Sequence, residues 1–186
     1  MTPDPRSQAV VDDSRRTDPL VTVPDAEHAN WRWRAVVQTA GPAVVVDMDG
    51  VVSDASKRQH FLRGGRRDWD GFFGACGEDT PIEEVARLLG LLAPELQVVL
   101  LTARPTSVQP QTLEWLARHR LRWDLLVMRP DGDRIPSEVY KRRSVHQLRK
   151  RGFDLQLAFE DDKVNRQMLI DEGIPCVYIH SGYYER

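Results

Sequence analysis

Two aspartates that follow a short apolar run carry the strongest chemical signal in this sequence. Residues 43–46 are Ala-Val-Val-Val, and Asp47 and Asp49 come after them, followed by Gly50. An aspartate carboxylate can attack phosphorus and form an aspartyl-phosphate, which divides phosphoester hydrolysis into two easier steps. We therefore expect Asp47 to be the nucleophile and Asp49 the general acid and base, which requires the pKa of Asp49 to lie above that of Asp47. Gly50 is expected to allow a sharp turn that brings backbone N–H groups toward the phosphate.

Polar side chains also follow two later apolar runs. Thr102 comes directly after residues 98–101, and Glu160 and Asp161 come after residues 157–159. Short apolar runs bounded by turn residues are typical of buried parallel strands. Because ligands bind outside the carboxyl ends of such strands, we expect these side chains to share one crevice with the two aspartates. The Thr102 hydroxyl is expected to contact a phosphate oxygen there.

A lysine and a metal ion are expected to complete this site. The chain has only 4 lysines against 22 arginines, and Lys141 is expected to offset negative charge on the nucleophile and in the transition state. Mg²⁺ is a hard ion that prefers oxygen ligands. We expect it to be held by Asp47, by a backbone carbonyl near Asp49, and by Glu160 and Asp161.

Each of these signals, taken alone, has a structural alternative. Residues 160–162 can simply be the acidic first turn of the next helix, Lys141 can belong to a solvated helix face, and Thr102 can merely end a strand. Their order along the chain, each at a strand end or on a helix, favours the catalytic interpretation. The sequence leaves open which residue of 160–162 contacts the metal directly.

Composition restricts the class of protein. The chain has 186 residues, 41% hydrophobic and 29% charged, which fits one globular domain. The net charge of −2 gives no overall attraction to nucleic acid, so any basic surface must be local. We expect no membrane span and no secretory signal. Cys76 and Cys176 show no metal-binding spacing and are expected to be reduced thiols of a cytoplasmic protein.

The N-terminal segment differs in composition from the rest of the chain. Residues 1–30 are rich in proline, aspartate and arginine, which predicts a disordered or loosely docked tail before a domain over residues 31–186. Trp31 and Trp33 alternate with arginines at the start of this domain. They can stack on bases or cover an edge of the domain, and the second alternative is the more common one.

Alternating strand and helix patterns predict an α/β fold. We expect a Rossmannoid parallel sheet with helices on both faces and right-handed crossovers. The predicted strands lie near 43–46, 97–101, 124–128, 155–159 and 176–179. One helix is expected to open at Thr80 and Pro81 and to close before Pro94, and others are expected near 108–119, 137–151 and 163–172.

Residues 53–79 interrupt this alternation and are interpreted as a short insertion on the substrate side, with no large cap domain. An open site of this kind favours bulky or polymeric substrates. Arg67, with its neighbours Arg63 and Arg66, is expected to follow a polynucleotide backbone, and nearby aromatic residues to stack on a base. The alternatives are plain solubility for the arginines and a hydrophobic seat built from Trp69, Phe72 and Phe73.

Two further arginines follow predicted strand ends. Arg104 comes two residues after Thr102, and Arg129 comes directly after the run at 124–128. A guanidinium group can bind phosphate through two parallel hydrogen bonds. We therefore predict that both arginines bind substrate phosphates.

The motifs resemble those of haloacid dehalogenase (HAD) superfamily phosphatases over about residues 42–182. The matching stretches are 47–51 (Asp-Met-Asp-Gly-Val), 101–105 (Leu-Thr-Ala-Arg-Pro), Lys141 and 159–162 (Phe-Glu-Asp-Asp). The resemblance implies a Rossmannoid sheet, Mg²⁺ and an aspartyl-phosphate intermediate. It also implies the same roles for Asp47 and Asp49, phosphate stabilisation by Thr102 and Lys141, and metal binding at residues 160–161.

Within the superfamily, the chain is most similar to the 3′-phosphatase domain of phage-type polynucleotide kinase–phosphatases. The supporting stretches are 67–73, 102–105, 128–133 and 138–141, whereas the chain contains no GxxxxGK[ST] phosphate loop. Glu160 departs from this pattern, in which an Asp-Asp pair is usual. The expected function is a Mg²⁺-dependent phosphomonoesterase acting on nucleic-acid 3′ ends or nucleotides. A phosphatase of small metabolites and a non-catalytic binding protein are the alternatives, and the oligomeric state is not predicted.

Overall fold

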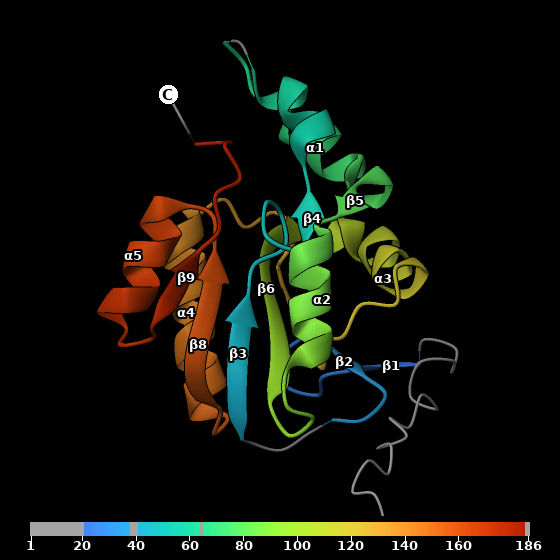
Figure 1. The fold of residues 1–186 in the computed structure, drawn as a ribbon. Helices are drawn as coiled ribbons and strands as arrows, with labels where there is room; N and C mark the ends of the chain where they lie inside the picture. Colours follow the sequence, from blue (N-terminus) through green and yellow to red (C-terminus); the bar gives the residue numbers. More distant parts are fainter. Residues whose placement is uncertain (1–20, 38–40, 64, 185–186) are drawn as a thin grey trace, which may run out of the picture.

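The computed structural model describes residues 21–37, 41–63 and 65–184, and its core is a seven-stranded sheet. The strand order is β1-β2-β7-β6-β3-β8-β9 (Figure 1). The strands are β1 (Thr22–Pro24), β2 (Trp31–Arg34), β3 (Pro42–Val46), β6 (Gln97–Pro105), β7 (Leu125–Arg129), β8 (Asp154–Glu160) and β9 (Cys176–Tyr178). The five neighbouring strands β7, β6, β3, β8 and β9 are parallel to one another. The strands β1 and β2 are antiparallel and form one edge of the sheet.

Helices cover both faces of this sheet, as the sequence predicted (Figure 1). The helices are α2 (Glu83–Leu91), α3 (Gln109–Arg118), α4 (Ser137–Lys150) and α5 (Lys163–Asp171). Side chains alternate between the two faces of a strand. Val44 and Val46 of β3 pack in the core cluster with residues of α2 and α3, whereas Ala43 and Val45 pack with residues of α4 and α5. None of the helices in the described part of the chain has the length and apolar character that a bilayer crossing needs.

The predicted helix start at Thr80 and Pro81 is wrong. These two residues form strand β5 (Thr80–Pro81), which pairs antiparallel with β4 (Ser53–Asp54), and α2 begins only at Glu83. Pro81 cannot donate a ladder hydrogen bond, and a two-stranded ribbon tolerates this because each of its strands has a free edge. The other predicted helices and strands agree with the structure apart from small shifts at their ends and the extension of β6 to Pro105.

The insertion lies between β4 and β5, so both of its ends meet in one small ribbon. It contains two 3₁₀ helices, η2 (Ser56–Leu62) and η3 (Cys76–Glu78), and the short helix α1 (Trp69–Gly74). A third 3₁₀ turn, η4 (Thr106–Val108), joins β6 to α3. In Figure 1 the insertion rises beyond the carboxyl ends of the parallel strands. The predicted absence of a large cap domain is therefore confirmed for the described residues.

Trp31 and Trp33 are core residues. Both side chains are fully buried on β2, which pairs with β7. Because they pack under the sheet edge, they cannot stack on the bases of a bound nucleic acid. The interpretation as residues that cover a domain edge is therefore the one that the structure supports.

Part of the segment assigned to a loose tail is integrated in the sheet. The sequence assigned residues 1–30 to this tail, but β1 (Thr22–Pro24) lies within the range and pairs with β2 along its whole length. Asp25, which follows β1, is buried. The folded domain thus begins before residue 31. Residues 1–20, the rest of the predicted tail, lie outside the described residues.

Asp25 fastens this edge to the rest of the domain. Its carboxylate accepts hydrogen bonds from Trp33 Nε1 (2.8 Å), from Arg151 Nη1 (3.0 Å) and from the backbone N–H groups of Glu27 and His28. Burial alone raises the pKa of Asp25, but the hydrogen bonds from Arg151 and Trp33 outweigh it and hold the pKa below its usual range. The ionised carboxylate therefore stabilises the folded state.

We predict that Asp25→Asn lowers the free energy of unfolding by about 2 kcal/mol at pH 7, because the Arg151 guanidinium loses its charged partner. A depressed native pKa stabilises above the unfolded pKa of about 3.9. The difference between variant and wild type should therefore shrink as the pH falls below that value. Denaturant unfolding of both proteins at several pH values measures this difference in the free energy of unfolding. Glu27→Gln is the control, since the Glu27 side chain is 70% exposed and lies 3.6 Å from the same arginine; an equal loss in both variants would contradict the prediction.

Candidate active site

The carboxyl ends of three neighbouring strands bring the predicted residues together. Asp47 follows β3, Thr102 lies on β6, Glu160 ends β8 and Asp161 follows it. Lys141 reaches the same place from the first half of α4. All five residues are buried, so their charges must be balanced within the site.

Lys141 lies between two carboxylates. Its Nζ is 2.9 Å from Asp47 Oδ1 and 2.6 Å from Glu160 Oε2. Burial alone lowers the pKa of Lys141, but the two carboxylates outweigh this and raise it above its usual value. The ammonium group therefore stays charged beside Asp47.

The remaining oxygen of Glu160 is also engaged. Glu160 Oε1 accepts hydrogen bonds from the backbone N–H groups of Asp161 and Asp162, each at 3.2 Å. Asp162 in turn caps α5, because its Oδ1 accepts from the N–H groups of Val164 (2.6 Å) and Asn165 (3.2 Å). Glu160 thus holds Lys141, and Asp162 holds a helix end.

Asp161 is the acidic residue with free ligand atoms. The residue is fully buried, and neither carboxylate oxygen has a hydrogen-bond donor in bonding geometry among the described residues. One oxygen from each of Asp47, Glu160 and Asp161 lies within 4.8 Å of the others. Unpartnered buried carboxylate oxygens are costly without a cation. The donor set therefore fits a hard divalent ion.

The close packing of these carboxylates shifts their pKa values. Burial, followed by the negative charge of Glu160, raises the pKa of Asp47 well above its usual value, although Lys141 opposes the shift. Burial also raises the pKa of Asp161 to about 7, with Glu160 acting in the same direction and the Ser181 hydroxyl and Lys141 against it. The site thus carries more negative charge than its own cationic side chains neutralise.

Gly50 is required by the position of Asp161. Its backbone φ is +92°, a conformation that residues with a side chain rarely adopt. A Cβ at this position would lie 2.0 Å from Asp161 Oδ2. The glycine therefore lets the loop after β3 approach Asp161 closely. The N–H group of Gly50 itself donates to the Ser53 carbonyl oxygen at 2.8 Å.

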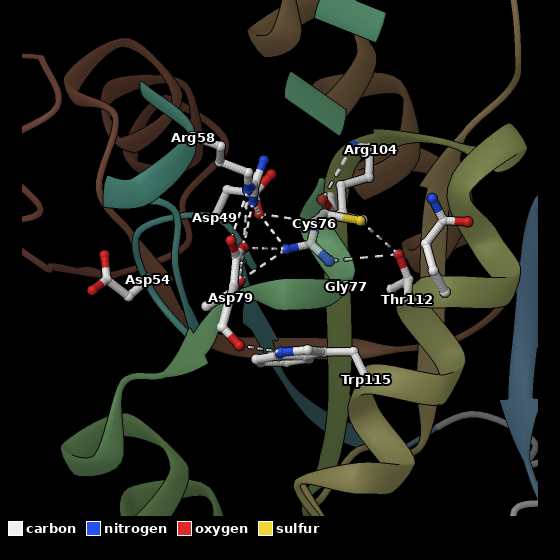
Figure 2. A network of polar contacts seen from close by, with 12 residues as sticks. Asp49, Asp54, Arg58, Cys76, Gly77, Asp79, Arg104, Thr112 and Trp115 are labelled. Atoms are coloured by element: carbon white, nitrogen blue, oxygen red, sulfur yellow. Dashed lines mark hydrogen bonds and ion pairs between the residues drawn. The ribbon is translucent and has the colours of Figure 1, made fainter. Parts of the chain in front are cut away.

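Asp49 is held by two buried arginines (Figure 2). Its Oδ1 accepts from Arg58 Nη2 (2.5 Å) and from Arg104 Nη2 (2.5 Å) and Nε (2.9 Å). Asp79 joins both arginines, at 2.7 Å from Arg58 Nη2 and 3.4 Å from Arg104 Nη2. Ser53 Oγ donates to Asp79 at 2.5 Å. These contacts fix the Asp49 carboxylate through one oxygen.

The predicted order of the two aspartate pKa values is wrong. Burial alone would raise the pKa of Asp49, but Arg104 and Arg58 outweigh it and hold the pKa below its usual value. The pKa of Asp47 is raised instead. The sequence argument considered only the neighbouring carboxylates and missed the two guanidinium groups. In the free protein Asp49 is therefore ionised, which suits a base more than an acid.

Arg104 does not lie where a substrate phosphate can reach it. Its side chain is fully buried, and beyond Asp49 it donates to Ser53 Oγ at 2.9 Å and to Thr112 Oγ1 at 3.5 Å. The prediction of direct phosphate binding by Arg104 is thus at odds with its burial. The chain after Thr102 turns this arginine inward, toward Asp49.

Arg58 and Asp79 are the site residues that the sequence analysis missed. They lie near the two ends of the insertion, one on η2 and one directly before β5. Trp115 Nε1 donates to the Asp79 carbonyl oxygen at 2.8 Å and fixes this segment against α3. The signal that could have found them was topological: the ends of an insertion must meet where it leaves the fold, which here is beside Asp49.

The other predicted binding residues lie around this centre. Thr102 Oγ1 accepts from the Arg104 N–H at 3.1 Å, which leaves its own hydrogen for another acceptor. Arg129 donates to the Ile135 carbonyl oxygen at 2.8 Å and lies 5.2 Å from the Tyr140 ring centroid, so it orders its own loop. Arg67 is exposed on the insertion, with its guanidinium 5.9 Å from the Trp69 ring centroid.

The aromatic residues of the insertion divide between the two predicted roles, a hydrophobic seat for the insertion and a stacking surface for a base. Phe72 is buried beneath the Arg58 guanidinium, which lies 4.2 Å from its ring centroid, and forms part of a hydrophobic seat. Trp69 stacks on Phe73 but remains 44% exposed. Of these three rings, Trp69 therefore offers the most free surface.

Comparison with known proteins identifies the family of this chain. The sequence model of the family described as the polynucleotide kinase PNKP phosphatase domain matches residues 41–184. None of the curated proteins matches the chain.

Solved structures show the same fold. A chain of the Pnkp1/Rnl/Hen1 complex is 22% identical, with a TM-score of 0.62, over 75% of this chain and 46% of that chain. A chain of the Pnkp1/Rnl/Hen1 RNA repair complex is 21% identical, with a TM-score of 0.61, over 78% and 46%. The class C acid phosphatase from Bacillus anthracis with tungstate bound is 17% identical, with a TM-score of 0.53, over 80% and 69%. This chain thus spans less than half the length of the first two.

The family match covers most of the chain, and its range includes Asp47, Asp49, Lys141, Glu160 and Asp161. The chain therefore belongs to the PNKP phosphatase-domain family of the HAD superfamily and is a phosphatase.

Proposed function

We propose that the protein is a Mg²⁺-dependent phosphomonoesterase that removes 3′-phosphates from polynucleotides through an aspartyl-phosphate on Asp47. The arrangement around Asp47 carries the proposal. Lys141 lies 2.9 Å from its carboxylate, the unpartnered carboxylate of Asp161 lies beside it, and Asp49 is fixed two residues further on. This is the set of groups that an in-line attack on phosphorus needs.

Asp47 and Asp161 are the residues that we propose hold Mg²⁺. The Glu160 carboxylate is already paired with Lys141, and the Asp49 carboxylate is already paired with Arg58 and Arg104. When bound, the ion neutralises the excess carboxylate charge and the phosphate dianion and polarises the phosphoryl oxygens. Asp47 is then ionised in spite of its raised pKa in the free protein.

In the first step, a carboxylate oxygen of Asp47 attacks phosphorus while the bond from phosphorus to the ester oxygen breaks. Thr102 donates its free hydroxyl hydrogen to a phosphoryl oxygen, and the Lys141 ammonium offsets the developing charge. The leaving oxygen takes a proton from Asp49. That proton is available because the substrate dianion adds a like charge beside Asp49, which raises its pKa from the low value of the free protein.

In the second step, Asp49 accepts a proton from water as the water oxygen attacks the aspartyl-phosphate. The bond between phosphorus and Asp47 breaks, which releases inorganic phosphate and restores the carboxylate. Within the described part of the chain, every arginine hydrogen bond to Asp49 goes to Oδ1. Oδ2 thus remains to carry the proton in both steps.

The form of the insertion supports a polymeric substrate. It is too short to enclose the site, and it carries the exposed residues Arg63, Arg66 and Arg67 next to the free ring of Trp69. Such a combination can bind a single strand by backbone charge and base stacking. The family match and the likeness to a chain of an RNA repair complex point to the same substrate class.

We predict that wild-type protein hydrolyses an aryl phosphate only with Mg²⁺, and that Asp47→Asn lowers kcat by at least about 10³-fold because the nucleophile is removed. Asp161→Asn should raise the Mg²⁺ concentration needed for half-maximal rate. Steady-state assays after chelation and metal titration measure both effects. Equal activity of wild type and Asp47→Asn would refute the mechanism.

We predict that Arg58→Lys lowers kcat about 10- to 100-fold with little change in KM, because a lysine cannot hold Asp49 and Asp79 together. Removing the guanidinium also raises the pKa of Asp49, so the acid limb of the pH–rate profile should move to higher pH. Arg87→Lys, exposed on α2, is the matched control. A lower rate with an unmoved pH limb would indicate that Arg58 acts only on stability.

We predict a preference for oligonucleotides with a 3′-phosphate over those with a 5′-phosphate, mononucleotides and sugar phosphates. Replacing Arg63, Arg66 and Arg67 by glutamine should weaken binding of the oligonucleotide and flatten its dependence on salt. Each arginine that no longer binds a phosphate removes about 0.7 from the slope on single strands. Competition assays at several salt concentrations measure this. Inert oligonucleotides beside rapidly hydrolysed sugar phosphates would favour the small-metabolite alternative.

A further inference from the structure

The segment after β9, residues 179–184, passes from the metal side of the site to the base of the insertion. The Ile179 N–H donates to the Glu160 carbonyl oxygen at 3.0 Å. Ser181 then comes so close to Gly50 that a Cβ on the glycine would lie 3.1 Å from the serine Cβ. In Figure 1 this segment and the insertion both rise beyond the carboxyl end of the sheet. The segment is thus a second wall of the site.

Tyr183 anchors this segment. Its hydroxyl donates to Asp54 Oδ1 at 2.7 Å, on the strand that opens the insertion. Burial and the Asp54 carboxylate raise the pKa of Tyr183 above its usual value. Burial also acts to raise the pKa of Asp54, but the hydrogen bonds from Tyr183 and Ser56 together with the charge of Lys57 outweigh it and lower that pKa. The phenol therefore keeps its proton, and the carboxylate stays ionised. This bond ties residues 179–184 to the insertion.

Tyr184 follows directly, and its hydroxyl makes no comparable hydrogen bond to another of the described residues. Its residue surface is 51% exposed. After burial, the carboxylates of Asp161 and Asp47 are the main causes that raise the pKa of its hydroxyl. The ring therefore belongs to this second wall, directly after the fixed Tyr183, with about half of its surface free.

We propose that Tyr184 is a substrate-contacting residue whose ring packs against the sugar or base of the nucleotide that carries the scissile phosphate. This inference rests on the proposed function and adds a specificity-determining residue to it. The fixed Tyr183 orients the neighbouring ring before substrate binds, so little conformational freedom is lost. Stacking on an aromatic ring tolerates any base, because every base has a π-face. Such a wall therefore suits a phosphatase that recognises the end of a nucleic acid and is indifferent to its base sequence.

Two substrates separate this contact from the chemistry. A 3′-phosphate oligonucleotide offers a nucleoside to the ring, whereas glycerol phosphate offers no ring at all. We expect Tyr184→Ala to raise KM for the oligonucleotide about tenfold, the effect of removing one base stack. Its kcat, its Mg²⁺ requirement and its kcat/KM for glycerol phosphate should stay as in wild type. Tyr184→Phe should match wild type on both substrates.

Further variants test how the ring is held and whether another ring serves instead. Tyr183→Phe removes the anchor and should raise KM for the oligonucleotide without changing the rate on glycerol phosphate. Leu91→Ala, at a residue 77% exposed on α2, is the matched control for loss of surface apolar area. Thermal unfolding of each variant checks that the fold is kept.

Several results would overturn the inference. An unchanged KM in Tyr184→Ala would do so, and so would an equal loss on both substrates or a loss in Tyr184→Phe as large as in the alanine variant. A large oligonucleotide effect in Trp69→Ala alone would assign the stacking surface to the insertion. Wild type that does not hydrolyse the oligonucleotide would contradict the proposed function as well, whereas the variant results contradict only the role of Tyr184.

Discussion

The structure depends on balancing carboxylates that are packed together at one end of the sheet. Asp47, Asp49, Asp79, Glu160 and Asp161 lie there. Among the described residues, the first two aspartates, Asp79 and Glu160 are paired with Arg58, Arg104 and Lys141, whereas Asp161 has no cationic partner within ion-pair distance. Buried charges are tolerated only when they are paired or bind metal. Five carboxylates against three cations leave two negative charges, which matches one divalent ion. The raised pKa values of Asp47 and Asp161 mark where positive charge is missing.

The three cations divide the site into two halves with different tasks. Lys141 joins Asp47, the proposed nucleophile, to Glu160. The two arginines serve Asp49, which they orient through one oxygen and keep ionised in the free protein. The two aspartates, separated by one residue, thus have opposite pKa shifts because their neighbours differ. In the proposed mechanism, these two environments serve a nucleophile, Asp47, and a proton carrier, Asp49, at the same strand end.

The same charges couple the insertion to the catalytic centre. Arg58 and Asp79 belong to the insertion, yet their contacts with Asp49 and Ser53 make it part of the site. On the other side, Tyr183 ties residues 179–184 to Asp54. Elements far apart in the sequence therefore form the surroundings of Asp47 and Asp49, while the core beneath them is an ordinary layered sheet.

The strands, most helices and the catalytic candidates could be predicted from the amino-acid sequence, because these depend on local periodicity and on motifs at strand ends. Apolar runs such as residues 43–46 predict a buried strand, and the aspartates after it must then lie at its carboxyl end. The start of α2 was misplaced because the pairing of Pro81 with Ser53 is not a local property. Which side chains face one another could be seen only in the folded protein. The tertiary structure buried Arg104, supplied Arg58 and Asp79, and reversed the pKa order of the two aspartates, since electrostatic energy depends on distance in space and not on separation along the chain.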